Sequence, residues 1–458
     1  MADSVSESAA REAPAESSAP PNSANQNGGA PQSRLALTLR ALRHRNFQLF
    51  FGGQFISLIG TWMQTVAESW LVYRLTGSAL VLGVVGFSSQ IPVFLLSPLG
   101  GLVADRYNRH RVVIATQSAA MVLAGIYATL ILGGWITVRE IITLAAALGV
   151  VNAFDIPARQ AFLVEMVGKE DLLNAIALNS SMFNGARVVG PAVAGVLVAW
   201  IGEGWCFAAN SLSYIAVIVG LLLMSVTARE TAGEGSMVEH IQEGFHYAQH
   251  TMPIRALLLL VGLMSLVGMP YSVLMPVFAD QVLHGGARGL GLLMGATGVG
   301  AMLGALSLAM RSGVKGLGRL AALAGGGFGV SLLIFSVSRN FWLSFVVLVP
   351  VGFSMMLQMA SSNTLIQAMV PDRLRGRVMS LYSMMFMGMA PLGSLFGGTL
   401  AEKIGAPWTV AIGGALSVVG AIWFYTQLPA LRIEARQLII AQGMAGGEPA
   451  EQMTARLR

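Results

Sequence analysis

Apolar stretches of about 20 residues recur along the chain from Phe47 onward, and they constrain the fold more than any other feature. That length allows a helix to cross the hydrocarbon core of a bilayer. The strands of a membrane β-barrel would give short alternating segments instead, and the sequence lacks them. The predicted fold is an all-α membrane protein with twelve transmembrane helices, at about residues 47–73, 79–103, 111–133, 137–157, 174–200, 205–226, 255–279, 289–310, 318–338, 341–363, 377–401 and 407–428.

The composition excludes several classes of protein. Only 11% of the residues are charged and 55% are hydrophobic, whereas a soluble domain carries about 25% charged residues. The one cysteine, Cys206, rules out a disulfide framework and a cysteine-based metal cluster. Neither a phosphate-binding GxxxxGK[ST] loop nor an HExxH motif occurs, so we expect no enzyme, no cofactor and no metal.

Lysine and arginine are distributed unequally around the predicted spans. With both termini placed inside, 22 of the 28 lie in the tails and inner loops, and five lie in outer loops. The positive-inside rule therefore predicts that both termini are cytoplasmic. Contact of these cations with anionic lipid explains the net charge of +6, so we expect the lipid bilayer as a partner and no nucleic acid.

The second half of the chain repeats the first. Residues 166–205 and 369–408 share 13 identities in 40 ungapped positions, including four pairs of glycines. This offset carries the fifth span onto the eleventh, which predicts two parallel six-helix repeats. The expected organisation is a disordered N-terminal tail (1–33), an N-terminal half (34–226), a cytoplasmic linker with an amphipathic helix (227–254), a C-terminal half (255–428) and a cytoplasmic C-terminal tail (429–458). The apolar face of the linker helix is expected to consist of Val238, Ile241, Phe245 and Ala248.

The loop after the second span reads Gly101-Leu-Val-Ala-Asp105-Arg106-Tyr-Asn-Arg109-His110-Arg111. It resembles the signature loop of the major facilitator superfamily, in which a glycine, an Asp-Arg pair and trailing basic residues recur at this spacing. The resemblance implies a cytoplasmic gate formed by Gly101, Asp105, Arg106, Arg109 and Arg111. The alternative is a basic loop that only sets the topology.

Within this gate, Asp105 is expected to face the positive N-terminus of the eleventh span, near Arg375 and Arg377. The motif usually has a glycine where this chain has Asn108. Asparagine tolerates a left-handed backbone, so we expect the same turn to form.

Further stretches narrow the resemblance. They are Gly60-Thr-Trp-Met-Gln64, Asp155-Ile-Pro-Ala-Arg159-Gln160-Ala161 and Asn184-Gly-Ala-Arg187-Val-Val-Gly190-Pro191. Together they resemble a bacterial exporter branch that contains enterobactin-type siderophore exporters and macrolide-efflux-like permeases. The resemblance implies export, but it does not identify the cargo.

Three charged residues within the predicted spans are candidates for mechanism. Arg187 lies near the middle of the fifth span, so it should face a wet cavity or pair with a carboxylate, either functionally or as a structural ion pair. Glu68, in the outer half of the first span, could exchange a proton in low dielectric, or could pair with Arg74 instead. Asp155 is a third candidate, although it could simply shape the end of the fourth span.

Neutral polar side chains inside the spans also need partners, because lipid offers none. Together with Arg187, four of them are predicted to line a central substrate cavity: Gln64, Gln90, Asn184 and Gln358. Methionines such as Met355 and Met359 cluster near Gln358, and we interpret them as packing residues.

The predicted function is secondary active transport by alternating access between the two halves. Following the resemblance, we expect a monomeric, proton-coupled exporter of a small organic molecule (a siderophore, drug or secondary metabolite) in the bacterial inner membrane. Two alternatives stay open. One is a lipid or lysolipid flippase, or an importer, on the same fold. The other is a non-transporting membrane scaffold or sensor, which the gate motif disfavours because a scaffold needs no gate.

Overall fold

The computed structural model describes residues 40–225, 237–311 and 313–445, and all regular structure in these ranges is helical. The disordered tail expected at 1–33 lies outside the described residues. A 3-10 turn, η1 (Arg40–Arg43), precedes the N-terminal half, whose helices are α2 (Arg45–Thr76), α3 (Ala79–Arg106), α4 (Arg109–Leu132), α5 (Val138–Val167), α6 (Leu172–Ile201) and α7 (Glu203–Leu222).

Helix α8 (Met237–His250) leads into the C-terminal half. The α-helices of that half are α9 (Met252–Leu263), α10 (Pro270–Val273), α11 (Met275–Val277), α12 (Gly286–Ala309), α13 (Leu317–Val337), α14 (Phe341–Met369), α15 (Asp372–Ser383), α16 (Met389–Ile404) and α17 (Ala406–Ala445). Three π-helical segments interrupt them: η2 (Met264–Gly268), η3 (Phe278–Val282) and η4 (Met384–Gly388).

The expected spans fall on these helices or on runs of them. Among the described residues, 11 helices or runs are long and apolar enough to cross a membrane, which confirms an all-α membrane fold. Helix α2 coincides with the first expected span but is not among the 11. Its 32 residues include Gln54, Gln64 and Glu68, and these polar side chains lower its hydropathy.

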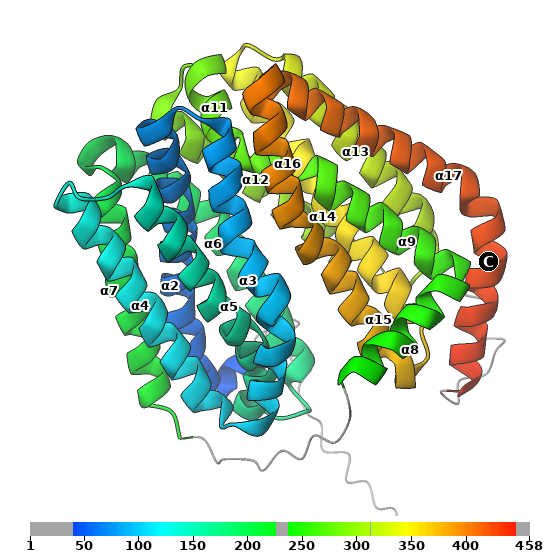
Figure 1. Cartoon of the computed structure of the whole chain (residues 1–458). Helices are drawn as coiled ribbons and strands as arrows, with labels where there is room; N and C mark the ends of the chain where they lie inside the picture. Colours follow the sequence, from blue (N-terminus) through cyan, green and yellow to red (C-terminus); the bar gives the residue numbers. More distant parts are fainter. Residues whose placement is uncertain (1–39, 226–236, 312, 446–458) are drawn as a thin grey trace, which may run out of the picture.

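The two halves form separate bundles that lie side by side (Figure 1). Helices α3 and α6 of the N-terminal half pack against α16 and α12 of the C-terminal half. We call the face that carries residues 40–45, 106–111 and 372–377 the basic face, and the face that carries residues 74–79 and 402–406 the opposite face. The paired helices lie close together near the opposite face and diverge toward the basic face (Figure 1).

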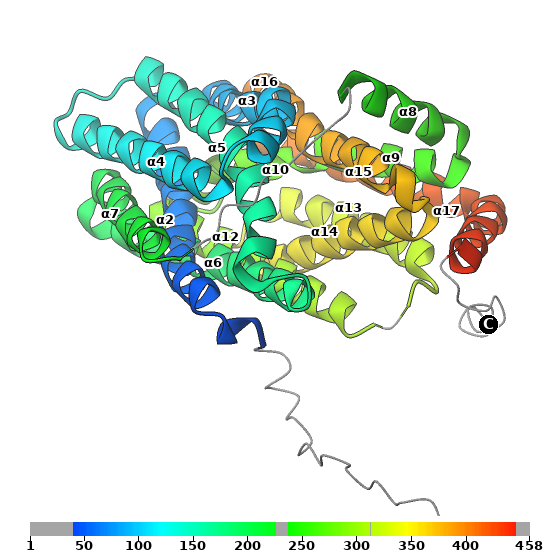
Figure 2. The same ribbon diagram turned by 90° about the horizontal axis from the view of Figure 1, so that it is seen from below.

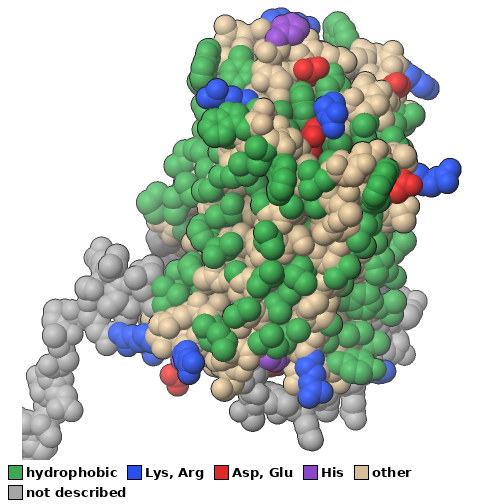
Figure 3. Space-filling view, turned by 90° about the vertical axis from the view of Figure 1, so that its left-hand side faces the viewer, with side chains coloured by type: hydrophobic (Ala, Val, Ile, Leu, Met, Phe, Trp, Pro, Cys, Tyr) green, Lys and Arg blue, Asp and Glu red, His purple; other side chains and the backbone are tan. Residues whose placement is uncertain are grey.

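The surface between the two faces is suited to lipid. Charged side chains gather mainly near the two ends of the side shown in Figure 3, and hydrophobic side chains cover much of the area between them. Five tryptophans at helix ends near the opposite face are more than half exposed: Trp135, Trp200, Trp205, Trp342 and Trp408. Tryptophan favours the boundary between lipid and water, so these side chains mark that boundary on the opposite face.

Matched glycines of the sequence repeat adopt the same backbone conformation. Gly202 ends α6 with φ 86° and Gly405 ends α16 with φ 88°, a region that side chains with a Cβ rarely occupy. Both residues then begin the turn into the last helix of their half. The two copies therefore share local geometry as well as sequence.

Three local expectations need correction or completion. Asn108 is not left-handed: it has φ −61° and caps α4, its Oδ1 accepting a hydrogen bond from the Arg111 backbone N–H at 3.1 Å. In α8, Ala248 is buried but Phe245 is 51% exposed, and the side chains of residues 238 and 241 lie outside the described set. Helix α17 continues to Ala445, well into the segment expected as a tail.

Candidate functional site

A cavity of about 330 Å³ lies between the two halves. The N-terminal half contributes Glu68 from α2, Gln90 from α3 and Arg187 from α6, while the C-terminal half contributes Tyr271 from α10 and Thr297 from α12. Three of the residues singled out from the sequence therefore share one cavity, although they are far apart in the chain. Its walls combine apolar side chains with a few polar groups, as is typical of small-molecule sites.

Arg187 carries the positive charge of this cavity. Its guanidinium lies 5.5 Å from the centre of the Trp62 ring, a cation–π contact. Among the described residues it forms no ion pair. The carboxylates that the sequence offers as its partners are Asp155, Glu68 and Asp105, and they contact Arg159, Tyr127 and Arg109 instead. A half-buried guanidinium without a carboxylate partner can bind an anionic group that enters the cavity.

Glu68 lies on the wall of the same cavity and is held by Tyr127. The Tyr127 hydroxyl lies 3.0 Å from Glu68 Oε1 and 2.9 Å from the carbonyl oxygen of Ile141, and its ring stacks on Phe207. The hydroxyl has one hydrogen to donate, so it donates a hydrogen bond either to an ionised Glu68 or to the carbonyl. When Glu68 is neutral, the hydroxyl oxygen can accept a hydrogen bond from its carboxyl group. The alternative ion pair with Arg74 is not formed, since Arg74 binds Glu203 at 2.7 Å.

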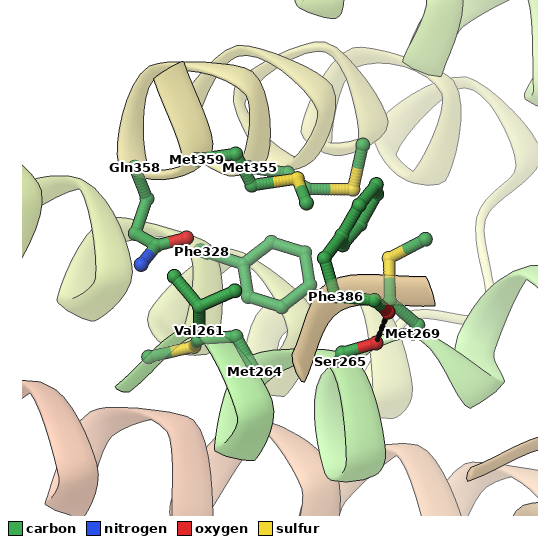
Figure 4. A pocket seen from close by; sticks show the side chains of 9 residues that line it. All are labelled: Val261, Met264, Ser265, Met269, Phe328, Met355, Gln358, Met359 and Phe386. Atoms are coloured by element: carbon green, nitrogen blue, oxygen red, sulfur yellow. Dashed lines mark hydrogen bonds between the residues drawn. The ribbon is translucent and has the colours of Figure 1, made fainter. Parts of the chain in front are cut away.

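The other expected cavity residues lie elsewhere. The Gln64 side chain accepts a hydrogen bond from Asn210 at 2.5 Å inside the N-terminal half, and Asn184 donates to the Ser180 carbonyl at 2.9 Å. Gln358, with Met355 and other apolar side chains, lines a cavity of about 10 Å³ within the C-terminal half (Figure 4). That volume holds about one water molecule, so it cannot bind an organic cargo in this conformation.

Asp155 lies in a separate polar cluster toward the basic face. Its carboxylate accepts hydrogen bonds from Thr116 and Gln117, each at 2.8 Å, and pairs with Arg159 at 3.3 Å. The carboxylate is 6% exposed, so these three partners compensate for the burial of its charge. This arrangement joins α4 to α5.

Arg109 anchors the gate motif to its own half. It pairs with Glu165 of α5 at 3.1 Å, donates to the Ala104 carbonyl at 2.9 Å and lies 3.4 Å from Asp105. A Cβ placed on Gly101 would meet no atom within 4 Å, so this glycine faces open space in the present conformation. Asp105, Arg106 and Arg111 are exposed on the basic face.

The arginines expected near Asp105 bind other carboxylates here. Arg373 pairs with Glu243 of α8 at 3.3 Å, Arg377 pairs with the same carboxylate, and Arg375 pairs with Asp372. Gly244 of α8 packs directly on the backbone of Arg377. The pairing of Glu243 was not predicted from the sequence. A signal was present, because the linker helix carries an acidic residue and the start of α15 is rich in arginine.

The opposite face is closed by contacts between the halves. Tyr73 donates to Asp280 at 3.1 Å, and Glu402 accepts from the Ser78 hydroxyl at 3.0 Å and from the Leu80 backbone N–H at 3.1 Å. These three hydrogen bonds join the two halves, and all three lie at this face. The two halves are therefore held together at the opposite face.

Two π-helical segments meet at the middle of the C-terminal half. The Ser265 hydroxyl in η2 donates to the carbonyl oxygen of Phe386 in η4 at 2.5 Å (Figure 4). A π segment leaves backbone carbonyls without their usual helical partner, and this serine satisfies one of them. Both segments interrupt helices that line the interface between the halves, where a change in helix direction would alter the cavity.

Residues 36–454 match a protein-family model described as transmembrane secretion effector. The chain is 27% identical over 377 residues to the staphyloferrin A transporter of Staphylococcus aureus, covering 82% of this chain and 94% of that protein. It is 24% identical over 385 residues to macrolide efflux protein A of Streptococcus pyogenes, covering 82% and 94%.

A crystal structure of a bacterial homologue of the iron transporter ferroportin, in its inward-facing state, is similar in fold. Its TM-score is 0.65 at 17% identity, covering 83% of this chain and 98% of that one. These relatives and the apolar helices indicate a multi-pass protein of the bacterial inner membrane. The chain belongs to the transmembrane secretion effector family, whose relatives here are transporters of the major facilitator superfamily.

Proposed function

We propose that the chain crosses the membrane twelve times, with both termini in the cytoplasm, and exports a small organic anion in exchange for protons. The positive-inside distribution supports this topology, which makes the basic face cytoplasmic. The paired helices diverge toward that face and hydrogen bonds join the halves at the opposite face, which supports a conformation that is open to the cytoplasm. Cargo would enter the cavity from this side, and the protein would work as a monomer.

The observation that carries the proposal is the unpaired Arg187 on the wall of the cavity between the halves. A half-buried cation is costly, and an anionic cargo would offset that cost by supplying the missing carboxylate or other acidic group. The similarity to a staphyloferrin A transporter supports a siderophore-like cargo of this charge. A cationic drug would leave Arg187 unpaired and be repelled by it.

Glu68 is the proposed proton site. Tyr127 can bond to Glu68 in either protonation state by rotating its hydroxyl, so the carboxyl can gain and lose a proton without losing its partner. A proton entering from the outside would neutralise Glu68 after the cargo leaves. The neutral carboxyl is less costly in the closed, water-poor cavity, which favours the return to the cytoplasm-open state.

The gate motif would close the cytoplasmic face in the alternate state. In the present conformation Arg373 and Arg377 are held by Glu243, and Asp105 is held by Arg109. We infer that closure brings Asp105 to the start of α15, where the helix N-terminus and Arg375 attract its carboxylate. Gly101, which faces open space now, would then allow α3 to approach the C-terminal half closely.

Export from cells tests this function. A bacterial strain without its own efflux pumps is loaded with staphyloferrin A or with a cationic macrolide, with and without the chain, and the remaining cargo is measured over time. We expect the chain to accelerate loss of the anionic compound only, and Arg187→Gln to remove that acceleration. Export of the macrolide alone, or export unaffected by Arg187→Gln, would overturn the proposed cargo class.

A further inference from the structure

A second cavity of about 480 Å³ lies on the basic face of the C-terminal half, apart from the cavity between the halves. It is bordered by the start of α9, the loop before α13 and the start of α13, the end of α14 and residues 424–439 of α17. Seen from the basic face, α17 lies at the edge of this half (Figure 2). The cavity therefore adjoins the surface that the membrane would cover.

Its lining divides into an apolar part and a cationic part. Leu365 of α14 and Phe424 and Leu428 of α17 provide apolar walls, and Phe424 is 1% exposed. The cationic part consists of Lys315, Arg319, Arg432 and Arg436. Among the residues that the structure describes, no acidic side chain lines the cavity.

These four cations have no carboxylate partner within the described part of the chain. None of them forms an ion pair with any residue that the structure describes, whereas Arg373 and Arg377 on the same face share Glu243. Arg432 and Arg436 are one helical turn apart on α17, and both are exposed. A concentrated positive charge beside an apolar wall complements an amphiphile that has an anionic head.

The N-terminus of α13 also favours an anion at this place. Gly316 is the N-cap of this helix and lines the cavity. A glycine has no side chain, so it cannot form a hydrogen bond to the first backbone N–H groups of the helix. Those N–H groups and the helix dipole favour an anion at this position. The helix is 21 residues long, so its dipole is fully developed.

We propose that this cavity binds an anionic glycerophospholipid from the cytoplasmic leaflet, with its phosphate among the four cations and an acyl chain against Phe424 and Leu428. The lipid is a resident ligand and not the cargo, because the site is separate from the cavity between the halves. Helix α17 has 40 residues, about twice the length needed to cross the membrane. Its last third, which carries Arg432 and Arg436, would lie at the membrane surface and be fixed there by the lipid.

Lipid binding to the purified full chain tests the proposal independently of export. Native mass spectrometry in detergent measures binding of dioleoyl-phosphatidylglycerol and dioleoyl-phosphatidylcholine. We expect one tight site for phosphatidylglycerol. Arg432→Gln with Arg436→Gln should weaken it roughly 25-fold, since each basic residue near anionic lipid contributes roughly a factor of five. The control, Arg43→Gln with Arg45→Gln, removes two exposed cations from the same face outside the cavity and should bind as the wild type does.

Three results would overturn the proposal. Equal binding of the two lipids, or equal loss in both double variants, would mean that the cavity has no specific role. Displacement of the lipid by millimolar inorganic phosphate would identify a free anion site. If phosphatidylglycerol binds only after residues 446–458 have been deleted, the chain's own terminus occupies the cavity. Circular dichroism of each variant verifies that its helices are intact.

Discussion

Substituting Gly398 by valine should shift the protein away from its cytoplasm-open state. A Cβ on Gly398 would lie 2.7 Å from the carbonyl oxygen of Ala79 and 2.8 Å from the Cα of Gly83. Both contacts are with the backbone of α3, so no side-chain rotation can relieve them. Helices α3 and α16 would have to separate at the opposite face, which is the movement that opens this face.

The expected size of the shift follows from the cost of overpacking. Inserting methyl groups into a well-packed contact costs about 1–3 kcal/mol. If the outward-open state is free of the clash, the ratio of the two states changes by a factor of about 5–150. Because the substitution acts on one state only, the whole cost appears as a population shift.

Thiol labelling measures this population. Thr65 is exposed on the wall of the cavity between the halves, and it is replaced by cysteine as the labelling site. The only native thiol, Cys206, is fully buried and should not react. A membrane-impermeant reagent added outside should label Gly398→Val faster than the parent. The control is Gly52→Val, whose added Cβ meets no atom within 4 Å. Equal rates for Gly398→Val and Gly52→Val would refute the proposed closure of the opposite face.

Three further substitutions test other parts of the account. Asp105→Asn should abolish or strongly slow export, while the amount of protein in the membrane, measured by immunoblot, stays unchanged. Normal export by this variant would show that the Asp105 carboxylate has no role in the gate. Glu68→Gln keeps the shape of the side chain but cannot exchange a proton, so export should no longer respond to the pH gradient across vesicles. Asn210→Leu leaves the buried Gln64 oxygen without its donor and should lower the free energy of unfolding by about 1–3 kcal/mol in thermal denaturation; an unchanged melting temperature would contradict this.

The helices were predictable because each apolar stretch is longer than a soluble core helix requires. The sequence repeat even located glycines that end corresponding helices, such as Gly202 and Gly405. The π segments η2 and η4 were not predictable, because their residues are mainly apolar and each has a single glycine, as the regular spans of this chain also do. Their position depends on packing between helices, as the bond from Ser265 to Phe386 illustrates.

The places of the charged residues in the candidate site were easier to predict from the sequence than those of the neutral polar residues. A charge in the membrane interior has few acceptable environments, so Arg187 could be assigned to a cavity from sequence alone. Glu68 could be singled out as a candidate for proton exchange, but its place on the same cavity was not predicted. An amide can be satisfied by a neighbouring amide or a backbone carbonyl, as Gln64 and Asn184 are, and sequence does not distinguish these partners. The pairing of Glu243 with Arg377 depends on where α8 lies, which composition does not determine.

Proton movement driven by cargo tests the central claim most directly. The purified chain is reconstituted into liposomes that contain a pH-sensitive dye, and staphyloferrin A is added outside without an imposed gradient. The account predicts a cargo-dependent pH change inside the liposomes that disappears in Glu68→Gln and in Arg187→Gln. Cargo transport with no accompanying pH change, or an equal pH change in both variants, would contradict coupled exchange through the cavity between the halves.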